Sequence, residues 1–206
     1  MKRICIDPGH PSYFEGTQKV NWGCVESGVK EVELNLILSV LLEKILQENR
    51  FSTTLTRYDN EKIISNKNRA KIAKEFNADL FLRIHVDSER HKDSEVKGVR
   101  TFYPPPAAKN ISMQSYEIAL SIHRAIIKRT GLVDQGVCDE RVTTLKNKQG
   151  ILTGTYWANK YKIPTVLLEA IYLSNLQDRR WILKSANQKL MMKAVAEGIK
   201  QYFKKE

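Results

Sequence analysis

The stretch Leu80–Val86 reads LFLRIHV, and it decides the class of fold. Its first three residues are all apolar, which is typical of a strand covered on both faces, as in parallel sheets. Short runs with the same character predict further strands. These are Lys2–Asp7, Phe51–Thr56, Gly98–Tyr103 and Thr165–Glu169. Turn-forming residues bound several of them, such as Pro8-Gly9 after the first.

Helical patterns separate these strands along the chain. In Glu31–Glu48 the leucines and isoleucines recur at steps of three and four residues, which predicts one apolar stripe on a helix. Further helices are predicted over Asn68–Phe76, Ile111–Arg129 and Asp178–Phe203, the last as one helix or a pair. Strands that alternate with helices need crossover connections. We therefore predict a single α/β domain over residues 1–206, with a twisted, mostly parallel sheet covered by helices on both faces.

The composition is that of a soluble globular protein. Of 206 residues, 42% are hydrophobic and 28% charged, and no apolar run approaches the roughly 20 residues of a membrane helix. No signal peptide is visible, because Met1–Arg3 leads straight into the first strand. We expect no membrane insertion, and either a cytoplasmic product or a chain whose leader has been removed. The three cysteines provide neither a disulfide framework nor a cysteine-based zinc site.

The chain is strongly basic, with a formal net charge of +11. Such a charge favours polyanions in general, including nucleic acid, anionic lipid and cell-wall polymers, and does not choose among them. The sequence contains no helix-turn-helix pattern and no aromatic RNA-binding motif, so nucleic acid is not the expected partner. The oligomeric state is left open.

Four chemically active side chains stand at the ends of the predicted elements. His10 follows the first strand, His85 ends the central one, Glu169 ends the last, and Glu31 opens the first long helix. Ligands of open α/β sheets bind outside the carboxyl ends of the strands. We therefore expect these four groups to converge at one edge of the sheet.

These residue types fit a hydrolytic zinc site. Such sites take three protein ligands, often two histidines and a carboxylate, and leave one position for water. The metal lowers the pKa of that water to about 7, and a second carboxylate can move its proton. His10, Glu31 and His85 could supply the ligands, and Glu169 the second carboxylate.

Each residue also has a simpler explanation. A single histidine is more often structural than a ligand, and Glu31 alone is better explained as a favourable acid in the first turn of a helix. Glu169 is harder to explain away, because it directly follows the apolar run 166–168. An unpaired charge near the core is costly, so this carboxylate needs a partner or a function.

Four other polar residues are assigned structural roles. His91 lies in a polar run and is interpreted as part of an exposed loop, whereas His123 shares a helix face with apolar residues and is interpreted as packed. Arg57 and Asp59 could touch a substrate, but a structural ion pair at a strand end is favoured.

Five segments stand in a characteristic order along the chain. They are ICIDPGH (residues 4–10), KEVELN (30–35), LTRYD (55–59), ADLFLRIH (78–85), and PTVLLE (164–169) followed by LSN (173–175). In this order they resemble the motifs of the zinc-dependent N-acetylmuramoyl-L-alanine amidases, which include autolysins, cell-separation amidases and phage endolysins. The resemblance extends from residue 3 to about the end of the last helix.

The resemblance implies a function and a set of site residues. It implies one zinc ion per chain, held by His10, Glu31 and His85, with Glu169 as general base and acid. The implied substrate is peptidoglycan, cut at the amide between N-acetylmuramic acid and the L-alanine of the stem peptide. The protein would thus act on the cell wall.

The chain departs from the family pattern at several places. Pro11 and Ser12 follow His10 where the family continues with two glycines, and Arg83 stands where serine is common. Glu33 is close enough to Glu31 to be a rival ligand, although the KEVELN register favours Glu31.

The segment between His10 and Glu31 also departs from the pattern. It is longer than is common and carries the aromatic residues Tyr13, Phe14 and Trp22. No substrate contact is assigned to it.

Two other functions stay open at this point. One is another zinc amidohydrolase, or a carboxypeptidase that acts on peptidoglycan peptides with the same ligands. The other is a non-catalytic basic module that binds the wall or nucleic acid. The presence of all four active side chains argues against the second.

Overall fold

A six-stranded sheet forms the centre of the molecule, in the strand order β6-β1-β7-β10-β8-β9. The computed structural model describes the chain except residues 15, 90–93, 105–108, 140–152 and 205–206. Strands β6, β1, β7 and β10 run parallel to one another, β8 is antiparallel to β10, and β9 is parallel to β8. The strands are β1 (Arg3–Pro8), β6 (Ser52–Leu55), β7 (Leu80–Asp87), β8 (Val99–Tyr103), β9 (Asp134–Asp139) and β10 (Thr165–Tyr172). The predicted mostly parallel sheet is confirmed.

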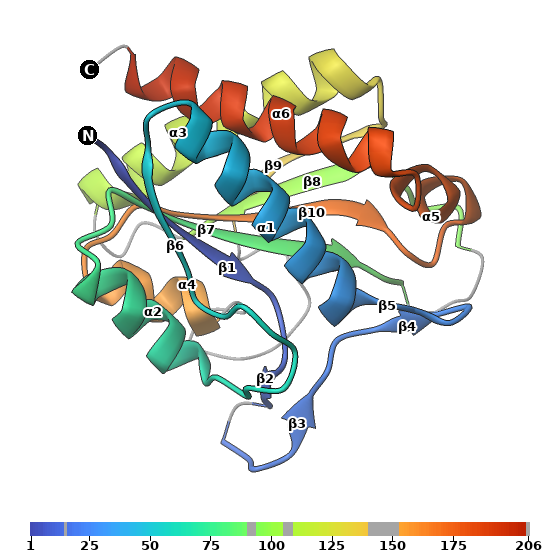
Figure 1. Ribbon diagram of the computed structural model, residues 1–206, viewed down its shortest axis with the longest axis horizontal. Helices are drawn as coiled ribbons and strands as arrows, with labels where there is room; N and C mark the ends of the chain where they lie inside the picture. Colours follow the sequence, from blue (N-terminus) through green and yellow to red (C-terminus); the bar gives the residue numbers. More distant parts are fainter. Residues whose placement is uncertain (15, 90–93, 105–108, 140–152, 205–206) are drawn as a thin grey trace.

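Helices cover both faces of this sheet (Figure 1). One face carries α1 (Glu31–Glu48), α3 (Lys109–Thr130) and α6 (Ser185–Phe203), with the short α5 (Leu176–Ile182) before α6. The other face carries the shorter helices α2 (Asn66–Glu75) and α4 (Thr153–Lys160). The predicted three-layer α/β arrangement is therefore confirmed.

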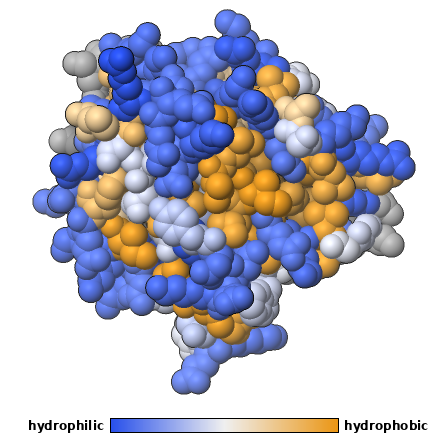
Figure 2. Space-filling model, viewed as in Figure 1, coloured by the Kyte–Doolittle hydropathy of each residue, from blue (hydrophilic) through white to orange (hydrophobic). Residues whose placement is uncertain are grey.

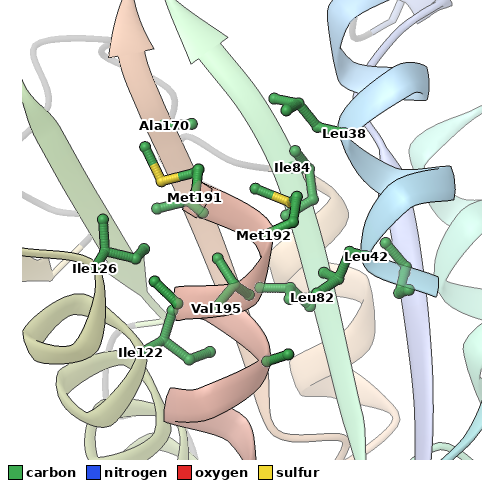
Figure 3. Packing of buried hydrophobic residues seen from close by; sticks show 14 of the residues in the cluster. Leu38, Leu42, Leu82, Ile84, Ile122, Ile126, Ala170, Met191, Met192 and Val195 are labelled. Carbon is green, nitrogen blue, oxygen red and sulfur yellow. The ribbon is translucent and has the colours of Figure 1, made fainter. Parts of the chain in front are cut away.

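The main core lies between the sheet and the three long helices. Figure 3 shows Met191 and Met192 of α6 packed beside Leu82 and Ile84 of β7, with Leu38 of α1 close by. All five side chains are buried, and each such side chain contributes roughly 1.5–3 kcal/mol relative to an exposed one. Apolar packing thus fixes this face of the sheet.

The opposite face carries a smaller apolar cluster. Cys5 and Phe81 of the sheet pack there against Ala70 and Ala73 of α2 and Ala158 of α4. Successive strand residues point to opposite faces of a sheet. Arg83 and His85, two and four residues after Phe81, therefore lie on the same face as Phe81. The face covered by α2 and α4 is therefore where the polar ends of the strands can form a site.

Several helices and strands of the structure differ from those predicted from the sequence. Strand β9 was not predicted, because its sequence DQGVCD has few apolar residues and it lies at the edge of the sheet. Helix α4 was not predicted either, because its eight residues are too few for a clear apolar period. The last predicted helix is a pair, α5 and α6, and β10 continues three residues past Glu169.

A buried ion cluster holds the end of β1 to its neighbours. Both carboxylate oxygens of Asp7 are paired: Oδ1 lies 2.6 Å from Arg69 Nη1 and Oδ2 lies 2.8 Å from Arg83 Nε. The Thr56 hydroxyl also donates to Asp7, and Arg83 Nη2 donates to Asn66. Burial alone would raise the pKa of Asp7, but the two guanidinium groups and the hydroxyl hold it well below its usual range.

We expect Asp7→Asn to lower the free energy of unfolding by about 3–5 kcal/mol, because it leaves two buried guanidinium groups without their carboxylate. The pKa of Asp7 is lower in the folded than in the unfolded chain. Its stabilisation is therefore complete above an unfolded pKa of about 3.9 and is lost as the pH falls toward the folded value. Denaturant unfolding at several pH values measures both effects.

The exposed pair Glu75–Lys71 supplies the control for this prediction. Glu75→Gln should change stability by less than about 1 kcal/mol, because exposed pairs contribute little. Equal losses of unfolding free energy in Asp7→Asn and Glu75→Gln would show that the buried ion cluster contributes no more to stability than an exposed ion pair.

Three further features of the molecule complete the description. No helix among the described residues has the length and apolar character needed to cross a membrane. An apolar groove runs between α1 and α6, lined by Leu36, Ile37, Val40 and Leu41, and it appears as the central orange area of Figure 2. The three cysteines are free thiols.

Candidate metal centre

Two histidines and one glutamate meet at the carboxyl end of the central strands. His10 follows β1, His85 lies near the end of β7, and Glu31 is the first residue of α1. One ligand atom from each of the three lies within 4.8 Å of the others. The structure thus brings together three of the four side chains expected to converge.

Glu31 is the centre of this cluster. Its Oε1 lies 3.1 Å from His85 Nδ1 and 3.3 Å from His10 Nε2. The amide of Asn35, one helical turn later, donates to the same oxygen at 3.2 Å, and the Cys24 main-chain N–H donates to Oε2 at 2.9 Å. Burial alone would raise the pKa of Glu31, but the two histidines hold it well below its usual range.

His10 is oriented by the segment that follows it. Its Nδ1 lies 3.2 Å from the main-chain carbonyl of Asn21. A protonated Nδ1 that donates to a carbonyl leaves Nε2 available to a metal, which is the usual arrangement of a histidine ligand. The segment forms two short hairpins, with strands β2 (Ser12–Tyr13), β3 (Val20–Asn21), β4 (Val25–Glu26) and β5 (Val29–Lys30).

Two glycines allow the chain to approach the cluster closely. A Cβ atom at Gly9 would lie 2.3 Å from the His85 ring, and one at Gly23 would lie 2.5 Å from Glu31 Oε2. Gly23 also has a positive φ of 79°, which disfavours other residues. Backbone thus packs directly against two of the three side chains.

His85 has the properties of a neutral metal ligand. Burial lowers its pKa to about 4, against the opposing effect of Glu31, so the ring is neutral at pH 7. Its Nε2 is buried and has no hydrogen-bond partner. A neutral imidazole is the form that binds metals, and two histidines with one carboxylate form a common zinc donor set. The residues present therefore fit a zinc ion.

Glu169 lies beside the cluster but is not one of its three members. In the sheet it pairs with His85 on one side and with Arg100 on the other. Burial, together with the charges of Asp87 and Glu31, raises its pKa well above the usual range. Its Oε2 is buried without a hydrogen-bond partner, which is costly unless a ligand or cation satisfies it.

The sequence did not assign roles to the residues that hold the ligands in place. Asn35 was part of a recognised motif, and its spacing of four from Glu31 on a helix could have revealed the contact. Arg57 was expected to pair with Asp59. That expectation is wrong, because Arg57 donates to four main-chain carbonyls, those of Pro8, Gly9, Val32 and Asp59, and to the Asn60 side chain. Its hydrogen bond to Asp59 is to the main-chain oxygen and not to the carboxylate.

Three further residues, His123, His91 and Glu33, were considered in the sequence. His123 is buried and contacts Thr101 and Asp134, so its structural assignment is confirmed. His91 lies outside the described residues. Glu33, the rival ligand, is half exposed and pairs with Lys30 at 2.8 Å, away from the cluster.

The fold and the site together define a class of protein. A mostly parallel α/β sheet with a largely buried His–Glu–His cluster at its carboxyl edge is the arrangement of a hydrolytic enzyme with a candidate metal centre. Residues 4–201 match the family described as N-acetylmuramoyl-L-alanine amidase, and the chain belongs to that family.

Individual relatives agree with this assignment. The probable cell wall amidase LytH of Staphylococcus epidermidis is 26% identical over 98% of this chain, which spans 58% of LytH. The N-acetylmuramoyl-L-alanine amidase LytC of Bacillus subtilis is also 26% identical over 98% of this chain, which spans 35% of LytC. The catalytic domain of the amidase CwlV from Bacillus (Paenibacillus) polymyxa var. colistinus is similar over 100% of both chains, with 26% identity and a TM-score of 0.76.

Proposed function

We propose that this chain is a single catalytic domain that hydrolyses the amide between N-acetylmuramic acid and L-alanine in peptidoglycan. The largely buried cluster of His10, Glu31 and His85, with Glu169 beside it, is the observation that carries the proposal. One zinc ion per chain would be held by the three cluster residues. When bound, zinc supplies Lewis acidity at neutral pH.

The side chains of the protein would then perform the proton transfers. Glu169 accepts a proton from the attacking water and later gives it to the nitrogen of the departing L-alanine. Asn35 and the Cys24 N–H hold Glu31 in place, and the Asn21 carbonyl orients His10. The site of action is the cell wall, where the net charge of +11 would favour association with anionic polymers.

Mass spectrometry of the fragments released from purified peptidoglycan tests this function. We expect free stem peptides that begin with the amine of L-alanine, and their loss after treatment with a chelator. Release of single carboxyl-terminal amino acids would instead indicate a carboxypeptidase. An absence of fragments, with zinc supplied, would favour the non-catalytic wall-binding module.

A further inference from the structure

A groove of about 450 Å³ lies on the face covered by α2 and α4. One wall is the β2–β3 hairpin, with Tyr13 and Phe14, and the other is formed by Asn66 and Lys67 at the start of α2 and by Trp157 of α4. In Figure 1 the hairpin extends beyond the body of the molecule next to this end of α2. The groove is therefore a feature of the long segment that follows His10.

The groove is joined to the metal cluster by short connections. Tyr13 lies three residues after His10, and the hairpin itself orients His10 through the Asn21 carbonyl. On the other wall, Asn66 accepts a hydrogen bond from Arg83, which lies two residues before His85 on the same face of β7. The groove and the cluster are thus built on the same elements of the chain.

Three aromatic rings line the groove, and of these Trp157 also packs against the smaller apolar cluster. Tyr13 and Phe14 are 38% and 45% exposed. The ammonium group of Lys19 lies 5.7 Å from the centre of the Phe14 ring, and that of Lys67 lies 5.1 Å from the Trp157 ring. Positive charges are therefore held over these rings by cation–π contacts.

A third lysine, Lys160, lies 5.3 Å from the same Trp157 ring. Lys19, Lys67 and Lys160 form no ion pair within the part of the chain that the structure describes. Their charges are thus available to an anionic ligand. Because two lysines lie over the Trp157 ring, stacking of a sugar on that ring is disfavoured.

From this geometry, and on the basis of the proposed function, we infer that the groove binds the carboxylates of an acidic stem peptide beyond L-alanine. The lysines attract the carboxylates, and the Tyr13 and Phe14 rings contact the aliphatic parts of the peptide. The amidase would therefore distinguish stems with free carboxylates from stems whose carboxylates are amidated.

Three substrates with the same scissile amide test this inference. They are an N-acetylmuramoyl peptide with free stem carboxylates, the same peptide with these carboxylates amidated, and N-acetylmuramoyl-L-alanine amide. We expect the double variant Lys67→Gln/Lys160→Gln to lose on the order of tenfold in kcat/KM on the acidic substrate alone, as expected for two exposed charge contacts. The other two substrates should be cleaved as by the wild type.

A matched double variant controls for net charge. Lys44→Gln/Lys189→Gln removes two exposed lysines from the groove between α1 and α6, and it should change none of the three rates. The inference is overturned if the wild type does not distinguish the acidic from the amidated substrate, or if both double variants lose the same amount. An equal loss by Lys67→Gln/Lys160→Gln on all three substrates would also overturn it.

Calorimetric binding of the acidic stem peptide separates this inference from the proposed function. Its affinity should fall on the order of tenfold in Lys67→Gln/Lys160→Gln, whether or not the protein cleaves any of the substrates. Unchanged affinity would overturn the inference. Soluble polyglycerol phosphate serves as a second probe. Binding of this polymer through the two lysines, with no binding of the peptide, would assign the groove to anionic wall polymers instead.

Discussion

Glu31→Ala is expected to remove most of the zinc affinity, while Glu33→Ala retains it. Glu31 Oε1 lies 3.1 Å and 3.3 Å from nitrogens of the two histidines, and its side chain is buried. Loss of an outer partner of a metal ligand typically costs 10–100-fold in affinity, so loss of the ligand itself should cost more. Zinc competition with a chelator of known affinity measures the difference.

Intermediate variants sharpen this prediction. Asn35→Ala removes a hydrogen bond to Glu31 but none of the expected zinc ligands. The zinc affinity of this variant should therefore lie between that of Glu31→Ala and that of the wild type. Glu33→Ala removes the same charge as Glu31→Ala from a half-exposed position. If Glu33→Ala lost the metal and Glu31→Ala kept it, the ligand assignment would be wrong.

Glu31 and Glu33, the two possible carboxylate ligands, lie on different sides of helix α1. Two residues apart on a helix, the side chains diverge by about 200°. Glu31 is in phase with Asn35 and Leu38, which are both fully buried, whereas Glu33 is in phase with Ile37, which is half exposed. The stripe predicted from the sequence included Ile37, so the pattern alone did not separate the two sides of the helix, and the choice of Glu31 rested on the KEVELN register.

The central strands could be predicted for a related reason. Their apolar runs are continuous, because helices cover both faces of the sheet, and His10, His85 and Glu169 stand at their carboxyl ends. In an α/β fold this places the three residues at one edge. The sequence therefore predicted that these side chains lie together at the carboxyl edge of the sheet.

Non-local contacts could not be predicted in the same way. Asp7 and Arg83 are 76 residues apart, and nothing local marks them as partners. From the sequence, Arg83 was only a departure from a family motif. In the structure it pairs with Asp7 and donates to Asn66, and so connects the end of β1 to the start of α2.

The short hairpins after His10 could not be predicted from the sequence, because a strand of two residues is too short to show an alternation of apolar and polar side chains. Strands β2 to β5 have only two residues each, and their pairing depends on turns and on contacts with the site. The Asn21 carbonyl that orients His10 is a main-chain atom, so the identity of the side chain does not reveal it.

Glu169→Gln is expected to lower kcat by at least 10²-fold, within the range of about 10²–10⁴ typical of general acid–base catalysis. The substitution keeps the shape of the side chain and removes the oxygen that can accept a proton. Zinc stoichiometry and thermal stability should be unchanged, because Glu169 is not one of the three clustered ligand residues. Steady-state kinetics on a soluble muramoyl peptide, with metal analysis of the same samples, measures both.

The argument for this role of Glu169 starts from its place in the sheet. It pairs with His85 in the neighbouring strand, so a rigid backbone holds its carboxylate beside the cluster. Water must lose a proton as it attacks the amide, and the departing nitrogen must gain one, because a neutral amide nitrogen is a poor leaving group. One buried carboxylate next to the reacting atoms can perform both transfers. Glu33→Gln, with the same change at a half-exposed position, should keep normal turnover. Near-normal turnover in Glu169→Gln would disprove the assignment, and loss of zinc would make Glu169 a ligand.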